Sequence, residues 1–180
     1  MSRIVLLTGS PRRTGNSRRM ADSFERSAIA LGHEVTRFDT AEMKVGGCRA
    51  CNCCYRNGKP CALEEGYNAV AEALETADGL VIATPVYWYG FPAQLKSVTD
   101  HWYSLCYAGR DLAGKRAALI ACCEDDDIGA FDAMRLSLGK SLELLKAELV
   151  GEVLVQNVHK LGDIDATDGI ARAAELARLF

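Results

Sequence analysis

Eight cysteines are spread unevenly along the 180-residue sequence. Five of them fall within fourteen residues: Cys48, Cys51, Cys53, Cys54 and Cys61. Thiolates bind soft metals and iron–sulfur clusters, and they also take part in thiol–disulfide exchange. A secreted disulfide scaffold would spread its cysteines more evenly and would need an export signal, for which the apolar run 4–7 is too short. The cysteine-rich loop, residues 45–63, is therefore predicted to serve metal binding or redox chemistry, or to carry reduced thiols.

The segment 9–17 has the composition of an anion-binding turn. It carries hydroxyl side chains, two arginines and two glycines between an apolar run and a helical pattern. Backbone amides at a helix N-terminus point toward an anion, and hydroxyls and an arginine complete a phosphate shell. A nucleoside-triphosphate loop is excluded because Asn16 stands where its lysine would be. The segment predicts a site for a small monophosphate, whereas a simple helix cap would account only for Asn16 and Ser17.

A second segment, 84–90, places three consecutive aromatic residues after another apolar run. Aromatic rings at the end of a strand offer flat surfaces on which a planar ligand can stack, and the backbone groups of the turn can bind its edge. Packing or a subunit contact is the alternative explanation for these aromatics. The candidate ring-binding residues are Thr84, Pro85, Val86, Tyr87, Trp88, Tyr89 and Gly90.

A third segment follows a further apolar run and contains Cys122, Cys123, Glu124 and then three aspartates, at 125–127. Asp125 or Asp127 is expected to cap the helix that follows, where a negative charge is favoured. The three histidines, His33, His101 and His159, are expected to be surface or capping residues. No side chain is singled out as a catalytic acid or base.

Apolar runs and helical periodicity alternate along the whole chain. The expected strands are residues 3–8, 34–38, 79–84, 116–122 and 152–158, and the expected helices are 20–31, 67–77, 95–105, 131–149 and 170–179. This alternation favours a single α/β domain over residues 1–180, with a five-stranded parallel sheet in the order 2-1-3-4-5 and helices on both faces. In such a sheet the three segments meet at the carboxyl ends of the strands, where ligands bind.

Charge and hydropathy limit the classes of partner. The net charge is −3, which provides no general attraction for nucleic acid or anionic lipid. No window approaches the ~20 apolar residues of a membrane span. We therefore expect a cytoplasmic protein that acts on small molecules or redox proteins.

A phosphate site beside a planar-ring site describes a pocket for flavin mononucleotide (FMN). The segments 9–17 and 77–100 also resemble the flavodoxin-like FMN reductase family, which includes iron–sulfur flavoproteins and NAD(P)H-dependent reductases. The resemblance implies a flavodoxin-like three-layer sandwich and non-covalent FMN, with the phosphate on Ser10, Arg12, Asn16 and Ser17 beside Gly15. It implies a flavin ring on residues 84–90. By their position after the fourth expected strand, Cys122, Cys123 and Glu124 are expected to form a further wall. The acids of that wall should lower the reduction potential of a flavin.

The spacing Cys48-x2-Cys51-x2-Cys54-x6-Cys61 resembles the cysteine pattern of iron–sulfur flavoproteins. Four thiolates can hold a [4Fe–4S] cluster. Other relatives have similar cysteines in this loop and no cluster, so reduced thiols are the alternative. Zinc is less favoured because the usual two-plus-two spacing is absent.

The main prediction is an FMN-dependent oxidoreductase that accepts electrons from NAD(P)H and passes them to a quinone, flavin, nitro compound or metal ion. One alternative is an iron–sulfur flavoprotein electron carrier with a redox-protein partner. A second is a non-redox module that binds a phosphorylated ligand, and a metal sensor on the cysteine loop is a third. The resemblance also implies a homodimer or homotetramer.

Overall fold

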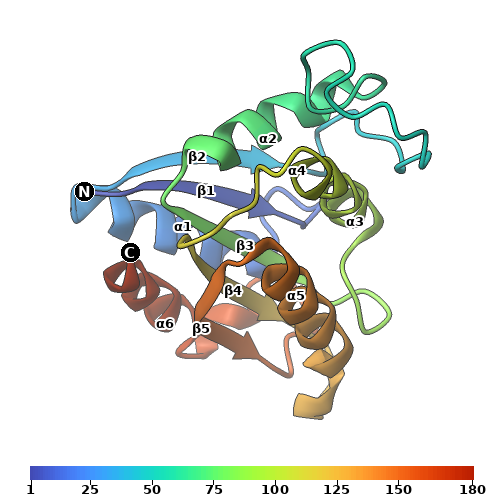
Figure 1. The fold of residues 1–180 in the computed structure, drawn as a ribbon. Coiled ribbons are helices and arrows are strands. Elements are labelled where there is room, and N and C mark those ends of the chain that lie inside the picture. Colours follow the sequence, from blue (N-terminus) through green and yellow to red (C-terminus); the bar gives the residue numbers. More distant parts are fainter.

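Five parallel strands form one sheet in the order β2-β1-β3-β4-β5. The computed structural model describes the backbone of residues 1–180 and every side chain except that of Glu65. The strands are β1 (Arg3–Thr8), β2 (Glu34–Asp39), β3 (Gly79–Pro85), β4 (Arg116–Cys122) and β5 (Glu148–Val155). This confirms the predicted flavodoxin-like sheet, with helices on both of its faces (Figure 1).

Each face of the sheet is covered by its own set of helices. On one face lie α1 (Asn16–Ala30) and α6 (Gly169–Glu175), which ends in the short 3-10 helix η3 (Leu176–Leu179). On the other lie α2 (Glu65–Thr76), α3 (Ala93–Asp100), α4 (Tyr103–Tyr107) and α5 (Asp132–Leu145). Two further 3-10 helices, η1 (Ile128–Phe131) and η2 (Asp163–Ala166), precede α5 and α6.

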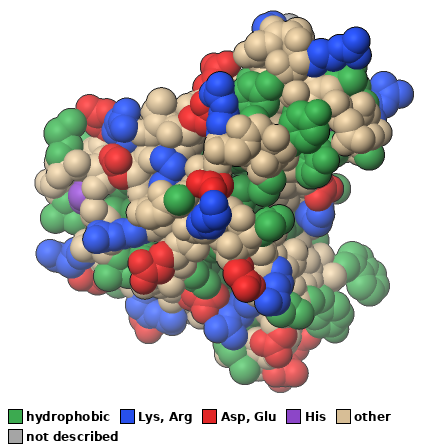
Figure 2. Space-filling model, in the orientation of Figure 1, with side chains coloured by type: hydrophobic (Ala, Val, Ile, Leu, Met, Phe, Trp, Pro, Cys, Tyr) green, Lys and Arg blue, Asp and Glu red, His purple; other side chains and the backbone are tan. Residues whose placement is uncertain are grey.

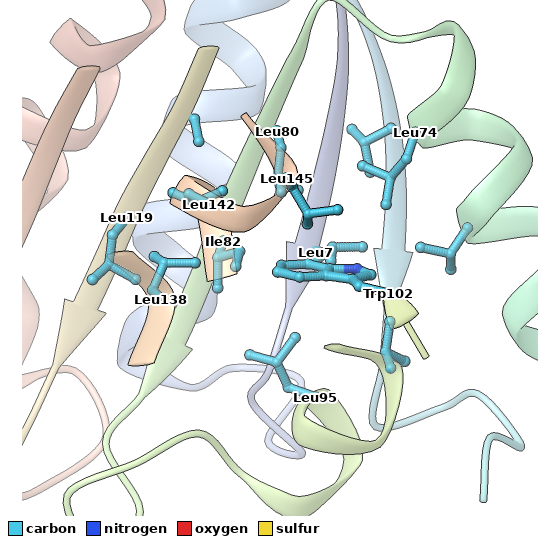
Figure 3. Close-up of a cluster of buried hydrophobic side chains, with 14 of the residues drawn as sticks. Leu7, Leu74, Leu80, Ile82, Leu95, Trp102, Leu119, Leu138, Leu142 and Leu145 are labelled. Carbon is cyan, nitrogen blue, oxygen red and sulfur yellow. The ribbon is translucent and has the colours of Figure 1, made fainter. Parts of the chain in front are cut away.

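The central strands are apolar on both faces because they are buried on both. Successive residues of a strand point to opposite faces, so Leu6 packs in the layer with α1 while Leu7 packs in the layer with α3 and α5. Figure 3 shows Leu7 beside Trp102 and Leu95, with Ile82 and Leu142 nearby in the same layer. This core fixes the strand ends from which the loops of the site emerge.

Several predicted boundaries are wrong, and each error has a local cause. The helix expected over 95–105 is two helices, because the chain turns at His101 and Trp102. Leu149 belongs to β5 and not to the preceding helix, which ends where Lys146 adopts a left-handed φ of 60°. The fifth strand covers Glu148–Val155 and not 152–158. His101 is buried and not a surface residue, although it does take the C-cap position of α3.

The register brings the carboxyl ends of the middle strands to one edge. Thr8 pairs with Ala83, and Pro85 pairs with Cys122. The amino and carboxyl termini of the chain lie together at the opposite edge, where Ser2 Oγ donates to the carbonyl of Phe180 at 2.7 Å (Figure 1). Among the described residues, no helix has the length and apolar character needed to span a bilayer.

Candidate functional site

A groove lies at the carboxyl edge of the sheet. It joins the loop after β1 to the loop after β3, because both Arg12 and Tyr87 line it. Eleven of the predicted binding residues line this groove: Ser10, Arg12, Gly15, Asn16, Ser17, Pro85, Val86, Tyr87, Cys122, Cys123 and Glu124. The predicted residues Thr84, Trp88, Tyr89 and Gly90 do not line it.

The N-terminus of α1 forms one end of the groove and has no negative charge of its own. Gly15 is the N-cap, no side chain caps the helix, and its first turn contains no acidic residue. The first amide bonded within the helix is that of Arg19, which donates to Gly15 O at 3.0 Å, so the amides of residues 16–18 precede the helical ladder. Amides and dipole together make this end suited to an anion.

The turn before α1 depends on a glycine. A Cβ on Gly15 would lie 2.6 Å from Ser10 Oγ and 3.1 Å from the carbonyl of Arg12. The same Ser10 hydroxyl accepts from the amide of Arg12 at 3.2 Å and so holds the turn closed. Any larger residue at Gly15 must push these groups out of the cradle.

One arginine of this loop faces the groove without an acidic partner. Arg13 pairs with Glu42 at 3.1 Å, and Arg18 pairs with Asp39 at 2.5 Å. Arg12 lines the groove, and no carboxylate among the described side chains lies within ion-pair distance of it. Arg12 is therefore the guanidinium available to a bound phosphate.

Asn16 lines the groove, and its side chain also bonds to the loop after β5. Its amide nitrogen donates to Lys160 O at 2.7 Å, and its amide oxygen accepts from the backbone of Gly162 at 2.9 Å. These bonds fasten the loop after β5 to the start of α1. They also bring Val158 and His159 into the wall of the groove, which the sequence did not indicate.

The loop after β3 forms a rigid two-residue turn. Tyr87 and Gly90 exchange backbone hydrogen bonds of 2.9 and 3.0 Å, and both residues between them have positive φ, 47° at Trp88 and 62° at Tyr89. Such a turn normally takes Asn-Gly, because side chains at positive φ are strained by about 1 kcal/mol or more. Here it presents two aromatic residues, with the side chain of Trp88 pointing away from the protein at 95% exposure.

Thr84 sits beneath this loop and not in the groove. It is fully buried, and a Cβ on Gly9 would lie 2.4 Å from its hydroxyl oxygen. Gly9 also donates to the carbonyl of Ala83 at 2.9 Å. This close approach ties the first two loops to each other.

The third wall is formed by the end of β4. Cys122 is buried against Ser17, and this burial raises the pKa of its thiol to about 12 even though Ser17 hydrogen-bonds to the sulfur. Cys122 is therefore a neutral thiol at physiological pH. Cys123 Sγ donates to the carbonyl of Asp125 at 3.5 Å, and burial raises its pKa as well. Asp127 accepts from the amide of Gly129 at 2.8 Å, as expected of a cap, although it caps η1 and not α5 directly.

A separate pocket is lined largely by residues of the cysteine loop. All four cysteines of the predicted ligand set, Cys48, Cys51, Cys54 and Cys61, line it. Burial and the neighbouring thiols raise the pKa of Cys54. Among the described side chains, no three His, Cys, Asp or Glu residues are close enough together to bind one metal ion. A cubane cluster is a different case, because each of its irons takes a separate thiolate from the wall of a cavity.

The cysteine loop is fastened to the fold by hydrogen bonds at several points. Asn68 of α2 accepts from the amide of Cys61 at 2.6 Å and donates to its carbonyl at 3.1 Å, both buried. The hydroxyl of Tyr55 donates to Glu75, which also accepts from Arg110 at 2.5 Å. Buried His101 lines the cavity and donates from Nδ1 to Ser97 O at 2.8 Å.

Known proteins resemble the chain in both sequence and fold. Residues 2–154 match the family model of NADPH-dependent FMN reductase. An iron–sulfur flavoprotein of Methanosarcina thermophila is 31% identical over 54% of this chain and 51% of its own length. An iron–sulfur flavoprotein of Archaeoglobus fulgidus is 30% identical over 70% of this chain and 64% of its own. The chain thus spans about half the length of the first of these relatives.

Solved structures share the fold at lower identity. A NAD(P)H:quinone oxidoreductase from Methanothermobacter marburgensis superposes with a TM-score of 0.76 at 20% identity, over 98% of this chain and 94% of its own. An FMN-dependent NADH-azoreductase from Bacillus anthracis in complex with FMN gives 0.74 at 14% identity, over 99% of both chains. By the match over residues 2–154, the chain belongs to the NADPH-dependent FMN reductase family.

Proposed function

We propose that this protein is an FMN-dependent oxidoreductase that takes electrons from NAD(P)H and delivers them to a small acceptor such as a quinone. The observation that carries the proposal is the continuity of the groove, which joins the amide cradle of α1 to the loop after β3. A phosphate at one end and a planar ring at the other match the two ends of FMN. When bound, FMN would supply hydride acceptance and electron donation.

The residues of the groove support this assignment by their chemistry. Arg12 and the first amides of α1 would bind the phosphate, and Ser10 holds the turn that presents them. Val86 is anchored by its amide, which donates to the carbonyl of Cys122 at 2.9 Å, so the second and third loops form one wall for the ring. Buried Cys122 and Cys123 would exclude water from that wall. None of these groups needs to transfer a proton, because the flavin carries the chemistry.

The direct test is the absorption spectrum of the natively purified protein before and after NADPH. We expect a bound flavin, released on denaturation and identified as FMN, whose absorption bleaches with NADPH under anaerobic conditions and returns with a quinone. A protein that contains no flavin and takes up none would contradict the proposal. Such a result would favour a non-redox module that binds a phosphorylated ligand.

A second function is favoured by the cavity lined by all four cysteines of the set. Four thiols around one cavity are the donor set of a [4Fe–4S] cluster, and the relatives named iron–sulfur flavoproteins suggest the same group. In that case the protein would carry electrons between a redox-protein partner and the flavin. Anaerobic purification should then give a brown protein with about four irons per chain. A yellow protein that contains no iron, both as purified and after reconstitution with iron and sulfide, would exclude this function.

A further inference from the structure

A second, open hollow adjoins the groove at the loop after β3. We call it the Trp88 hollow. It shares Val86, Cys123 and Glu124 with the groove, and so it opens beside the proposed position of the flavin ring. Its remaining lining residues are Trp88, Tyr89, Asp125 and Ala130. No lysine or arginine lines it.

The acidic turn, residues 124–127, carries negative charges that the structure leaves almost uncompensated. Among the described side chains, no lysine or arginine lies within ion-pair distance of these four carboxylates, and only Glu124 has a basic neighbour, His159 Nδ1 at 3.5 Å. All four residues are exposed. In Figure 2 acidic side chains gather at the lower edge of the view, over the region where α5 begins.

The acidic turn is held in place by its backbone and not by counter-ions. The carbonyl of Asp125 accepts from Asn157 at 3.0 Å, and that of Asp126 accepts from the side chain of Gln156 at 2.5 Å. Asp125 Oδ1 also accepts from the amide of Asp127 at 3.0 Å. These bonds hold the backbone of the turn so that Glu124 and Asp125 line the hollow, with Asp126 and Asp127 next to them in the chain.

The opposite side of the hollow is the aromatic turn, whose backbone is fixed while the side chains of Trp88 and Tyr89 are exposed. The mutual hydrogen bonds of Tyr87 and Gly90 hold Trp88 and Tyr89 at the positive φ values described above. Indole and phenol rings bind planar molecules by stacking, and their negative ring faces attract cations. The aromatic and acidic sides of the hollow therefore favour the same ligands, which are flat and not negatively charged.

We propose that the Trp88 hollow is the acceptor site and that it selects planar acceptors that are neutral or cationic over planar anions. The inference rests on the proposed function and names its acceptor class. The reaction is unchanged: a quinone gains two electrons and two protons to become a hydroquinone. NADPH would supply a hydride by way of the flavin, and water would supply the second proton. The selection arises because an anionic acceptor must approach several carboxylates that have no lysine or arginine partner. Solvent screens the resulting repulsion only in part.

The experiment compares three 1,4-naphthoquinones that carry a sulfonate, no charge, or a trimethylammonium group. The flavin is photoreduced anaerobically, so NADPH binding does not enter, and its reoxidation is followed by stopped flow. The measured quantity is the rate constant for the cationic quinone divided by that for the anionic quinone. We expect this ratio to be about tenfold higher in wild type than in Asp125→Asn/Asp126→Asn. The preference should shrink as salt is raised to about 0.5 M.

A change in the flavin potential would alter the rate constants for both quinones. Using their ratio therefore largely cancels this effect. The matched control is Glu143→Gln/Glu175→Gln, which removes the same charge at the C-terminal ends of α5 and α6, on the opposite edge of the sheet. The control should keep the wild-type ratio. An equal ratio in wild type and the Asp125→Asn/Asp126→Asn variant would overturn the inference.

A binding measurement keeps the inference separate from the proposed function. N-methylacridinium, a planar cation, should quench Trp88 emission and bind more weakly to the Asp125→Asn/Asp126→Asn variant. Failure to reoxidise with the neutral quinone would contradict the proposed function alone. Equal acridinium affinity in wild type and variant would contradict the charge selection whether or not the protein turns over.

Discussion

Gly15 is the residue on which the shape of the anion cradle depends most directly. A Cβ there would contact Ser10 Oγ at 2.6 Å, so Gly15→Ala should distort the turn and weaken FMN binding by about tenfold or more. Flavin fluorescence titration measures the effect. Gly139→Ala is the control, because no atom lies within 4 Å of its Cβ and alanine in a helix is favourable by roughly 0.5–1 kcal/mol. Unchanged affinity in Gly15→Ala would show that the cradle does not hold the phosphate.

The two neighbouring arginines of the first loop provide a second comparison at the same scale. Arg12 lines the groove, whereas Arg13 does not line it and pairs with Glu42. Arg12→Ala should weaken FMN binding by about 1.5–3 kcal/mol, the value of a hydrogen bond to a charged group. Arg13→Ala should change it by less than about 0.5 kcal/mol, because an exposed ion pair contributes little. Isothermal titration of the flavin-free protein gives both values, and equal losses would argue against this distinction.

The Cys122 thiol makes stability depend on pH in the alkaline range. Its pKa is raised from 9.0 to about 12 in the folded protein, because burial disfavours the thiolate. Its stabilising contribution is therefore complete below pH 9 and is lost as pH rises from 9 to 12, by at most about 1.4 kcal/mol per pH unit. Urea unfolding at several pH values should show a shallower alkaline loss in Cys122→Ala than in wild type. Parallel curves for the two proteins would contradict the assignment.

At the scale of elements, Asn68 is the buried side chain of α2 that holds Cys61 of the cysteine loop. Asn68 satisfies both backbone groups of Cys61, so Asn68→Ala leaves a buried amide and a buried carbonyl without partners. We expect a loss of about 1–3 kcal/mol in unfolding free energy and faster alkylation of Cys61, read by mass spectrometry. Asn57→Ala removes a bond of 3.2 Å in an exposed turn and should change neither. Unaltered Cys61 reactivity in Asn68→Ala would show that the loop is held by other contacts.

The acidic turn after β4 is also predicted to lower the redox potential of a bound flavin. Negative charges near a flavin oppose its reduction, so Asp125→Asn/Asp126→Asn should raise the midpoint potential, on the order of 20 mV for a two-electron couple. A spectroscopic redox titration against a reference dye measures this shift. A potential equal to that of wild type would remove the turn from the groups that tune the flavin.

The elements differ in how far the sequence alone predicts them. β1 and β4 match their predicted limits, because each is a buried apolar run between turn residues. The break between α3 and α4 was missed, since Leu95, Val98, Trp102 and Leu105 continue the helical spacing across it. The left-handed end of α5 at Lys146 was missed as well, because lysine gives no signal for that conformation.

The sequence predicts those groove residues that follow a strand directly. It does not predict those that reach the groove through contacts between distant segments. Ser10, Arg12 and Tyr87 are visible as turn residues after apolar runs, and the order of the strands brings them together. Val158 and His159 reach the groove only because Asn16 fastens the loop after β5. No spacing in the sequence connects residues 144 positions apart, such as Asn16 and Lys160.

For the whole molecule, the carboxyl and amino ends of the strands carry different features. The carboxyl edge carries the groove and the Trp88 hollow, while the amino edge is tied together by bonds such as that between Ser2 and Phe180. The hydrogen bond between Ser2 and Phe180 joins the two termini at the edge away from the groove. We expect a homodimer or homotetramer, which light scattering of the FMN-loaded protein would measure; a monomer would contradict it.

The contrast between the two tryptophans gives the protein a built-in optical probe. Trp102 is enclosed in the apolar layer, with 4% exposure, whereas Trp88 stands in solvent at the rim of the hollow. Their emission should therefore separate into a blue-shifted component from the interior and a red-shifted one from the rim. Iodide or acrylamide should extinguish the second component first. Occupancy of the site could thus be followed in real time without a label, with Trp88→Phe as the blank.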